Sequence, residues 1–549
     1  MVSPNGKSIA YLSSDEKTPE QILRKQNGED VEVWGAEWAH ARLRVVNVQT
    51  KQISSLALDR HVNGLCWSPN GEHLGIVSCR TPDGEEPFIT GSTISVVDAS
   101  LTAVKNVCNF PNRVNDLIWA NDGKFYFWAG VPANKTLCGF GVYATESNST
   151  SSDYERVAFG IDDDAVGLTQ VNGRVIVKLE HRLESRISLL CGKVLYSRKE
   201  ELQAFDVAIA PDSDEALLAV ATSDVNHPVE VYTMTPSGGA MVQLSSHGGA
   251  FADDDFGSCT FLSCLSTDRE TEIDSLYLTP TAYASGINGA IPIKPLPTVV
   301  LIHGGPTTRI TNAFNTYYYM FTPHLLSLGY GILLPNYRGS SGRGERFASY
   351  SIGGAGIHDY ADVIAATQHA IEQGYTDRDR MIVGGWSQGG FLSLLCSVRN
   401  GSHGYGWKFK ASIPGASISD VDAMALTSDR GSCFEPEIHE GRVAWNMNRD
   451  DTRNRAASAL WAFNDAVERS QQTGEMIVPP MLLLHGANDT RCHVSNTWAM
   501  RRALESRQLP FQMVIYPRQG HFFEEQKFWI DMAVRVAQWC QRYIGSGEQ

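Results

Sequence analysis

The chain has 549 residues, of which 42% are hydrophobic and 19% are charged. This length is too great for one hydrophobic core and predicts at least two domains, and the composition is that of a globular protein rather than a disordered one. The formal net charge of −15 disfavours a nucleic-acid partner, because no excess of basic side chains is available to neutralise phosphates.

The compartment is suggested by the N-terminal residues and the cysteines. The opening Met-Val-Ser-Pro-Asn-Gly-Lys forms no apolar run, so we expect no secretory signal, and no apolar stretch is long enough to cross a bilayer. Eleven cysteines are scattered without paired or metal-like spacing, which is typical of reduced thiols. We therefore expect a cytoplasmic protein with no membrane partner, no metal ion and no other cofactor. Homo-oligomerisation stays open.

Residues 1–262 contain weak repeats, each with a short β-branched or aromatic run, a turn and a second such run. The turns are Ser3–Lys7, Trp67–Gly71, Trp119–Lys124, Val171–Arg174 and a degenerate copy at Ala210–Ser213. Hairpins at this spacing predict an N-terminal β-propeller of about five to seven blades. No strand precedes the first turn, so either the first blade is incomplete or the propeller is open. An irregular β-sandwich is the alternative.

Residues 263–549 show a different pattern, in which nearly continuous apolar strands alternate with amphipathic helices. The predicted strands are Thr298–Ile302, Gly331–Pro335, Arg380–Gly384, Met481–Leu484 and Phe511–Tyr516, and the predicted helices include Asp359–Gln373 and Trp529–Tyr543. Such alternation predicts a doubly wound, mostly parallel sheet that helices cover on both faces. Ligands of such sheets bind beyond the carboxyl ends of the strands.

A Gly-x-Ser-x-Gly motif follows the strand Arg380–Gly384 and precedes an apolar, helix-forming run. This strand–turn–helix setting is typical of the nucleophile elbow of an α/β-hydrolase domain. The turn is so tight that Gly385 and Gly389 must lack a Cβ atom. It also presents the hydroxyl of Ser387 at a helix N-terminus, where developing negative charge is favoured. We therefore predict Ser387 as a nucleophile.

A serine hydroxyl needs a base at neutral pH, and the base needs a carboxylate that holds its tautomer. In α/β-hydrolases these residues follow the serine in the order acid, then histidine. Asp489 comes shortly after the strand Met481–Leu484, and His521 comes shortly after Phe511–Tyr516. Order and placement predict Asp489 as the acid and His521 as the base. Asp420 and Asp422, after a strand-like stretch, are the rivals of Asp489.

The negatively charged oxygen of a tetrahedral intermediate needs at least two hydrogen-bond donors. One is expected to be the backbone N–H of Gln388, the residue after the nucleophile. The other should come from His303–Pro306, a Gly-Gly-containing turn at the end of the first buried strand. We predict the N–H of Gly305 as that donor. The alternative is a turn that needs glycine for conformational reasons alone.

Taken together, the motifs resemble those of the prolyl oligopeptidase family, and most closely its acylaminoacyl peptidase and dipeptidyl-peptidase branch. They are His303-Gly304-Gly305-Pro306, Asn336-Tyr337-Arg338-Gly339-Ser340-Ser341-Gly342, Gly384-Gly385-Trp386-Ser387-Gln388-Gly389-Gly390, His485-Gly486-Ala487-Asn488-Asp489 and Gly520-His521. The resemblance implies a propeller that caps an α/β-hydrolase domain and admits short or unstructured peptides. It also implies a triad of Ser387, Asp489 and His521.

Several positions depart from the family pattern. Gln388 replaces the usual Tyr after the nucleophile, Arg343-Gly344 replaces Tyr-Gly, Ala355-Gly356 replaces Trp-Gly, and the loop Arg491–Val494 lacks the usual proline. None of these positions belongs to the triad, but several should face the substrate. A pair of acidic residues that would bind a free substrate N-terminus is not evident in the propeller. Glu180 and Glu184 are candidates, although an exposed charged strand also explains them.

The sequence therefore predicts a serine hydrolase that forms an acyl-enzyme and acts on short peptides or acyl-peptides, as an oligopeptidase or aminopeptidase. Because the substrate-facing positions differ from the family, an esterase or an acyltransferase or cyclase acting on a small metabolite is the alternative. A propeller interaction module with an inert hydrolase domain is a third reading, and the intact Ser, Asp and His argue against it.

Overall fold

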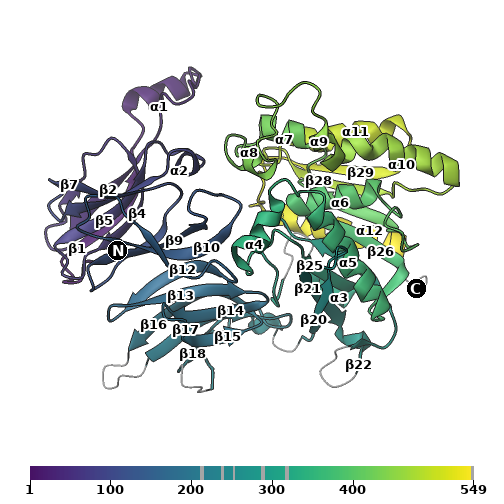
Figure 1. Cartoon of the computed structure of the whole chain (residues 1–549), viewed down its shortest axis with the longest axis horizontal. Helices are drawn as coiled ribbons and strands as arrows, with labels where there is room; N and C mark the ends of the chain where they lie inside the picture. Colours follow the sequence, from purple (N-terminus) through teal and green to yellow (C-terminus); the bar gives the residue numbers. More distant parts are fainter. Residues whose placement is uncertain (210–215, 236–239, 252–253, 286–290, 316–320, 546–549) are drawn as a thin grey trace. The chain divides into compact units, whose positions relative to one another are not determined.

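The computed structural model describes residues 1–549 except 210–215, 236–239, 252–253, 286–290, 316–320 and 546–549 (Figure 1). The chain divides into two compact units. The first unit comprises Met1–Glu180, Arg186–Tyr196 and Val207–Ala216, and the second comprises His181–Ser185, Ser197–Asp206 and Leu217–Gln549. The division into domains 1–262 and 263–549 stays a prediction.

Among the described residues, five sheets of consecutive strands belong to the N-terminal β-propeller. The first sheet has three strands, β1 (Ser8–Ser14), β2 (Ala41–Asn47) and β3 (Ile53–Ser55). Four sheets of four strands follow: β4 (His61–Trp67), β5 (His73–Cys79), β6 (Ser92–Asp98) and β7 (Val104–Phe110); β8 (Asn115–Trp119), β9 (Lys124–Val131), β10 (Gly139–Glu146) and β11 (Glu155–Ala158); β12 (Asp164–Val171), β13 (Arg174–His181), β14 (Glu184–Leu189) and β15 (Val194–Arg198); β16 (Glu201–Ile209), β17 (Ala216–Ser223), β18 (Glu230–Met234) and β19 (Val242–Gln243). The first sheet has one strand fewer than the other four. An incomplete first blade and an open propeller both stay predictions.

The predicted turns lie at the starts of strands. Gly6, Gly71, Gly123 and Gly173 all have φ between +70° and +85°, a backbone conformation that side chains with a Cβ atom rarely adopt. They precede β1, β5, β9 and β13. The fifth predicted turn, Ala210–Ser213, lies outside the described residues. Turn chemistry therefore located the hairpins even though the repeats share little sequence.

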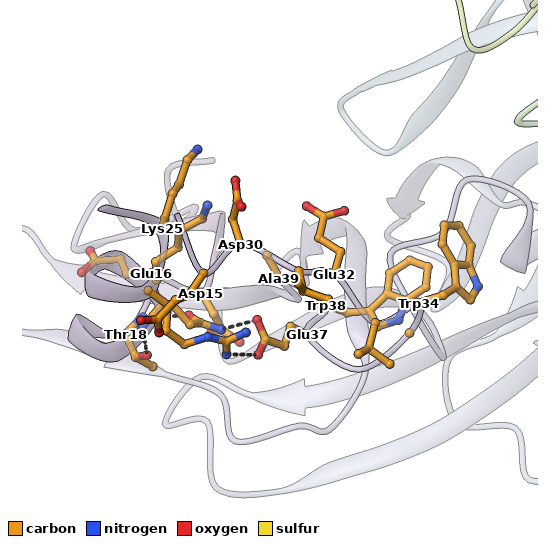
Figure 2. Close-up of a pocket in the computed structure, with 17 residues that line it drawn as sticks. Asp15, Glu16, Thr18, Lys25, Asp30, Glu32, Trp34, Glu37, Trp38 and Ala39 are labelled. Atoms are coloured by element: carbon orange, nitrogen blue, oxygen red, sulfur yellow. Dashed lines mark hydrogen bonds and ion pairs between the residues drawn. The ribbon is translucent and has the colours of Figure 1, made fainter. Parts of the chain in front are cut away.

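The connection between β1 and β2 holds helix α1 (Pro19–Gln26), and a second short helix, α2 (Glu86–Ile89), precedes β6. Figure 2 shows a pocket lined wholly by residues of this β1–β2 connection, between positions 15 and 39. The rings of Trp34 and Trp38 meet edge to face there, 5.5 Å apart, and Arg24 pairs with Glu37 at 2.9 Å. This pocket contains none of the predicted site residues.

An eight-stranded sheet forms the centre of the α/β-hydrolase domain, with the strand order β20-β21-β25-β24-β26-β27-β28-β29. Strands β24 to β29 pair in parallel, and β20 and β21 add an antiparallel edge. The strands are β20 (Gly257–Leu265), β21 (Glu272–Pro280), β24 (Leu296–Ile302), β25 (Gly331–Asn336), β26 (Thr376–Trp386), β27 (Ala411–Gly415), β28 (Met481–Gly486) and β29 (Phe511–Tyr516), and a separate ribbon pairs β22 (Ala284–Ser285) with β23 (Ile291–Pro292). All five predicted strands are confirmed.

Helices connect these strands, as the apolar periodicity predicts. They are α3 (Thr322–Ser327), α4 (Gly344–Ala348), α5 (His358–Glu372), α6 (Gln388–Val398), α7 (Val421–Thr427), α8 (Phe434–Ile438), α9 (Arg453–Ala457), α10 (Ala459–Thr473), α11 (Ser495–Ser506) and α12 (Gln526–Ile544), with short 3₁₀ turns at Gly249–Phe251, Thr281–Tyr283 and Ser349–Ser351. The sheet core consists of fully buried aliphatic side chains such as those of β24 and β28. Among the described residues, none of the helices is long and apolar enough to cross a membrane.

Candidate active site

Ser387 occupies the turn between β26 and α6, as the motif predicts. Its backbone has φ of 61° and ψ of −122°, which is a strained conformation for a residue with a side chain and is characteristic of functional turns. The N–H of Ser387 donates to the carbonyl of Gly415, at the end of the neighbouring strand β27, over 3.0 Å. The turn is thus anchored to the sheet, and it places Ser387 at the first turn of α6.

The glycines of the motif are required by backbones that approach closely. A Cβ atom on Gly389 would lie 1.8 Å from the carbonyl oxygen of Ile302, at the end of β24. A Cβ atom on Gly385 would lie 2.5 Å from the backbone of Gly389. No side chain fits at these distances, so the helix starting at Gln388 packs against the sheet only because both residues are glycine.

The structure brings His521 and Asp489 together. Nδ1 of His521 lies 2.8 Å from Oδ2 of Asp489. The other carboxylate oxygen, Oδ1, accepts hydrogen bonds of 2.9 Å from the backbone N–H groups of Arg491 and Cys492. Asp489 is 1% exposed. A buried carboxylate in this position holds the Nδ1–H tautomer of the imidazole and leaves Nε2 to act as a base.

Two opposing effects act on the carboxyl of Asp489. Burial raises its pKa, but the hydrogen bonds and charges of His485 and His521 outweigh burial and hold the pKa below its ordinary value. His485 is fully buried, and its Nε2 lies 2.6 Å from the carbonyl of Cys492 while its Nδ1 lies 2.7 Å from the hydroxyl of Thr497. Asp489 is therefore ionised near neutral pH, as the acid of a triad must be.

Hydrogen bonds between loops hold the three predicted residues in one region. Asn488 donates from its backbone to the carbonyl of Gln519 over 2.8 Å, which ties the loop after β28 to the loop after β29. The indole Nε1 of Trp386 donates to the carbonyl of His521 over 3.1 Å. Because Trp386 directly precedes Ser387, this bond links the elbow to the histidine loop.

The rivals of Asp489 have other partners. The carboxylate of Asp420 caps α7 by accepting from the N–H of Asp422 over 3.0 Å, and it also lies 3.2 Å from Nε1 of Trp461. Asp422 accepts from the side chain of Asn454 over 2.8 Å. It is Asp489 that contacts His521, so the geometry favours Asp489, whose role stays a prediction.

The two predicted oxyanion donors, of Gly305 and Gln388, are backbone N–H groups. The carbonyl of Gly304 accepts from the hydroxyl of Thr308 over 2.6 Å and lies 2.7 Å from Nδ1 of His303. Since the C=O and N–H of a trans peptide point in opposite directions, the N–H of Gly305 faces away from those groups. Within the described part of the chain, no acceptor meets the N–H of Gly305 or of Gln388.

Gly304 places this turn beside the nucleophile. A Cβ atom on Gly304 would lie 3.2 Å from Cβ and 3.8 Å from Oγ of Ser387. His303 is buried, its Nε2 lies 2.9 Å from the hydroxyl of Ser340, and burial lowers its pKa to about 4. The histidine is therefore neutral and serves to shape the turn. The assignment of Gly305 and Gln388 as oxyanion donors is consistent with this geometry and stays a prediction.

The motif Asn336–Gly342 supports the site through a buried arginine. Arg338 is 1% exposed, and its guanidinium binds both carboxylate oxygens of Asp362 at 2.8 Å, with a further ion pair to Asp268. The backbone N–H of Arg338 also donates to Asp362. A bidentate pair of this kind fixes the loop after β25 to α5.

Cys492 is a neighbour of the nucleophile that the motifs did not reveal. Its Sγ lies 3.8 Å from Oγ of Ser387, although the two residues are 105 positions apart. Burial, followed by the charge of Asp489, raises the pKa of this thiol well above its ordinary value. In the sequence, the departure of the loop Arg491–Val494 from the family pattern marked this loop as unusual, but it did not predict which residue the loop contacts.

In the described ranges, no cluster of three His, Cys, Asp or Glu side chains could hold a metal ion.

The geometry agrees with the comparisons with known proteins. Residues 317–547 match the model of the prolyl oligopeptidase family. This part of the chain is similar to that family. The match covers the elbow, the aspartate loop and the histidine loop of the prolyl oligopeptidase-type hydrolase domain.

Two curated relatives are a dipeptidyl aminopeptidase and an acylamino-acid-releasing enzyme. The chain is 28% identical over 314 residues to dipeptidyl aminopeptidase BIII of Pseudoxanthomonas mexicana, which covers 56% of this chain and 42% of that enzyme. It is 26% identical over 251 residues to the acylamino-acid-releasing enzyme of Sus scrofa, which covers 46% of this chain and 32% of that enzyme. The chain thus matches less than half the length of these relatives.

The similarity to solved structures covers the whole chain, not only the part that matches the family model. An acylaminoacyl peptidase of Pyrococcus horikoshii superposes with a TM-score of 0.64 at 17% identity, covering 100% of this chain and 89% of that one. At this identity the likeness shows the fold alone. It supports the combination of an N-terminal propeller and a C-terminal prolyl oligopeptidase-type hydrolase domain.

Proposed function

We propose that the chain is a serine peptidase that cleaves short peptides or acyl-peptides through an acyl-enzyme. The nucleophile is Ser387, the base is His521 and the acid is Asp489. The contact of 2.8 Å between Nδ1 of His521 and the buried carboxylate of Asp489 carries this proposal. The match of residues 317–547 to the prolyl oligopeptidase family, and the similarity to a dipeptidyl aminopeptidase and an acylamino-acid-releasing enzyme, support it.

The first half of the reaction forms the acyl-enzyme. Nε2 of His521 takes the proton of the Ser387 hydroxyl while Oγ attacks the scissile carbonyl, and Asp489 stabilises the imidazolium that forms. The N–H groups of Gly305 and Gln388 then bind the oxygen that becomes negatively charged. Each such donor accounts for about 10²–10³ in turnover in other serine hydrolases. His521 then gives its proton to the leaving amine.

The second half releases the acyl group. His521 takes a proton from water, the resulting hydroxide attacks the acyl carbonyl, and the proton returns to Oγ of Ser387. Where an amine or alcohol replaces this water, the same residues perform acyl transfer. The esterase or acyltransferase alternative therefore shares the acyl-enzyme and differs in the acceptor or leaving group.

The test is a rate panel on purified wild type and Ser387→Ala. The panel uses chromogenic amides with a blocked amino acid, a free amino acid or a dipeptide, together with a plain ester. Ser397→Ala is the matched control, because Ser397 is a buried serine of the same helix whose hydroxyl donates to the carbonyl of Ser393. A fluorophosphonate probe reports separately whether Ser387 is reactive.

We expect wild type and Ser397→Ala to cleave at least one amide class and to be labelled by the probe, and Ser387→Ala to do neither. Cleavage of the ester alone would contradict the peptidase and favour acyl transfer outside peptide catabolism. Absence of both turnover and labelling in a folded wild type would contradict any serine hydrolase function.

A further inference from the structure

The proposed reaction uses the backbone N–H of Gln388 and leaves its side chain without a role. The side-chain amide donates a hydrogen bond of 2.9 Å to Oδ2 of Asp359, on α5. The two residues are 6% and 4% exposed. A buried polar pair is costly to break, because each partner loses a hydrogen bond that water does not replace. This contact therefore ties the first residue of α6 firmly to α5.

Asp359 is itself held at the start of α5. Its Oδ1 accepts hydrogen bonds of 2.7 and 2.8 Å from the backbone N–H groups of Gly356 and Tyr360. Gly356 has φ of 76°, and a Cβ atom there would lie 2.9 Å from the side chain of Leu395, on α6. The backbone that holds the carboxyl group thus packs directly against α6. Asp359 is therefore a fixed partner for Gln388.

The backbone of Gln388 is held at one point. The carbonyl of Ser387, in the same peptide unit as the N–H of Gln388, accepts from the N–H of Phe391 over 2.9 Å. Because the C=O and N–H of a trans peptide point in opposite directions, the N–H of Gln388 is directed away from α6. The first turn of a helix has few such backbone bonds. The side-chain bond to Asp359 restrains Gln388 where the helix itself does so least.

This restraint matters for a group that binds developing charge. An oxyanion donor is effective because it is in place before the charge forms, so that no reorganisation is needed during the reaction. A misplacement of about 1 Å can cost on the order of 10²-fold in rate. An anchor on the residue that carries the donor therefore affects turnover without touching the substrate.

We propose that Asp359 is a positioning residue that, through the side chain of Gln388, holds the backbone N–H of Gln388 where it binds the oxyanion. The inference rests on the proposed function, because that function assigns this N–H to the oxyanion. It adds to the site a residue that lies 29 positions before Gln388 in the chain and contacts no reacting atom.

Gln388→Met tests the anchor, since it removes the side-chain donor and keeps both the length of the side chain and the backbone N–H. Gln368→Met, on α5, is the matched control, because the amide of Gln368 also donates to a carboxylate, that of Glu372, over 2.7 Å. Asp359→Ala removes the other partner, and the double variant Gln388→Met, Asp359→Ala shows whether the two residues act as one unit.

The measurements are kcat and KM on the best substrate of the rate panel, at pH 8, where Asp359 is ionised because burial raises its pKa to about 7. Each kcat is expressed per Ser387 that the fluorophosphonate labels at completion, so that loss of folded protein does not lower it. The second readout is inhibition by a matching trifluoromethyl ketone. Addition of Oγ to its carbonyl forms a tetrahedral adduct with a negatively charged oxygen, and no group leaves.

We expect Gln388→Met and Asp359→Ala each to lower kcat about 10- to 100-fold, less than the loss of a whole donor because the N–H remains. KM should be unchanged, and inhibition by the ketone should weaken by the same factor. The double variant should lose no more than the worse single variant, and Gln368→Met should match wild type. If Asp359→Ala does not fold, Gln388→Met alone decides.

Four results overturn the proposal: a kcat of Gln388→Met equal to that of wild type, a change in KM alone, additive losses in the double variant, or the same loss in Gln368→Met. The second of these would place the side chain of Gln388 in substrate binding. Additive losses would mean that Asp359 acts independently of Gln388.

Hydrogen–deuterium exchange keeps the inference separate from the proposed function, because it requires no turnover. The backbone amides of Gln388–Gly390 should exchange faster in Gln388→Met than in wild type, and at the wild-type rate in Gln368→Met. Faster exchange supports the anchor even if wild type cleaves neither amides nor esters, and equal exchange overturns it. Normal turnover in Gln388→Met would leave the proposed function standing and remove Asp359 alone.

Discussion

The side-chain amide of Gln388 donates a hydrogen bond of 2.9 Å to the carboxylate of Asp359, 29 residues earlier in the chain. Asp359 also accepts from the backbone N–H groups of Gly356 and Tyr360, at 2.7 and 2.8 Å. Burial raises the pKa of Asp359 to about 7, and the described residues include no ion pair to its carboxylate. The residue that follows the nucleophile is therefore held by a carboxyl group that titrates near neutral pH.

This burial predicts a pH-dependent stability. An unfolded aspartate has a pKa of about 3.9, so between pH 4 and 7 the folded chain retains a proton on Asp359 that the unfolded chain has released. Stability therefore falls as pH rises through this window. We expect the free energy of unfolding in urea to decline by on the order of 3 kcal/mol between pH 5 and 8 because of this group.

Asp359→Asn should flatten this decline, and Asp379→Asn, on the exposed start of β26, should leave it unchanged. Asp362 adds a smaller slope in the same direction, since burial raises its pKa to about 6 despite its ion pair with Arg338. An equal pH slope in wild type and Asp359→Asn would show that Asp359 does not titrate in this range.

Replacing Asp489 should disable the base without unfolding the site. Asp489→Asn cannot favour the Nδ1–H tautomer of His521, and the equivalent change costs about 10⁴ in kcat in other triads. Asp420→Asn should retain turnover near that of wild type, since an asparagine also caps a helix. The measurement is kcat on the best amide substrate. Near-normal kcat for Asp489→Asn would remove this residue from the triad.

Two glycines within two residues of predicted triad residues should respond differently to substitution by alanine. A Cβ atom on Gly389 would meet the carbonyl of Ile302 at 1.8 Å, whereas one on Gly520 would have its nearest neighbour at 3.8 Å. Gly389→Ala should therefore yield insoluble protein or lose fluorophosphonate labelling at Ser387, and Gly520→Ala should remain folded and labelled. Equal labelling of both variants would mean that the elbow tolerates a wider turn than this geometry allows.

The buried ion pair of Arg338 and Asp362 should affect the stability of the fold mainly when only one partner is removed. Arg338→Met leaves Asp362, which is fully buried, without its partner, and breaking such a pair costs about 3–5 kcal/mol. The double variant Arg338→Met, Asp362→Leu should recover a large part of this loss, since it leaves no uncompensated charge at position 362. Urea unfolding at pH 7 checks both values. A double variant less stable than the single one would show that the pair itself stabilises the fold.

Much of the fold was predictable because it rests on local patterns. The alternation of apolar strands with helices placed β24, β25, β26, β28 and β29, and α5 begins and ends within one residue of the predicted helix. The propeller was predictable from turns whose glycines require positive φ, although the number of blades was predicted only as a range. The described residues show five sheets, the first with three strands.

The candidate site was also predictable only in part. The positions of Ser387, Asp489 and His521 after their strands follow from chain order, because parallel strands bring their carboxyl ends to one edge of the sheet. The contacts of Gln388 with Asp359 and of Cys492 with Ser387 join segments 29 and 105 residues apart. No local pattern records such a pairing, since it depends on how the connections between strands pack.

The sequence by itself therefore determined the class of the two domains, the elbow and the order of the predicted triad, because these depend on periodicity, turn chemistry and strand order. Only the tertiary structure decided that Asp489, and neither Asp420 nor Asp422, contacts His521, and that the buried thiol of Cys492 lies beside the hydroxyl of Ser387. Burial and electrostatic contact are properties of the packed chain, and a side chain acquires them only when distant segments exclude water around it.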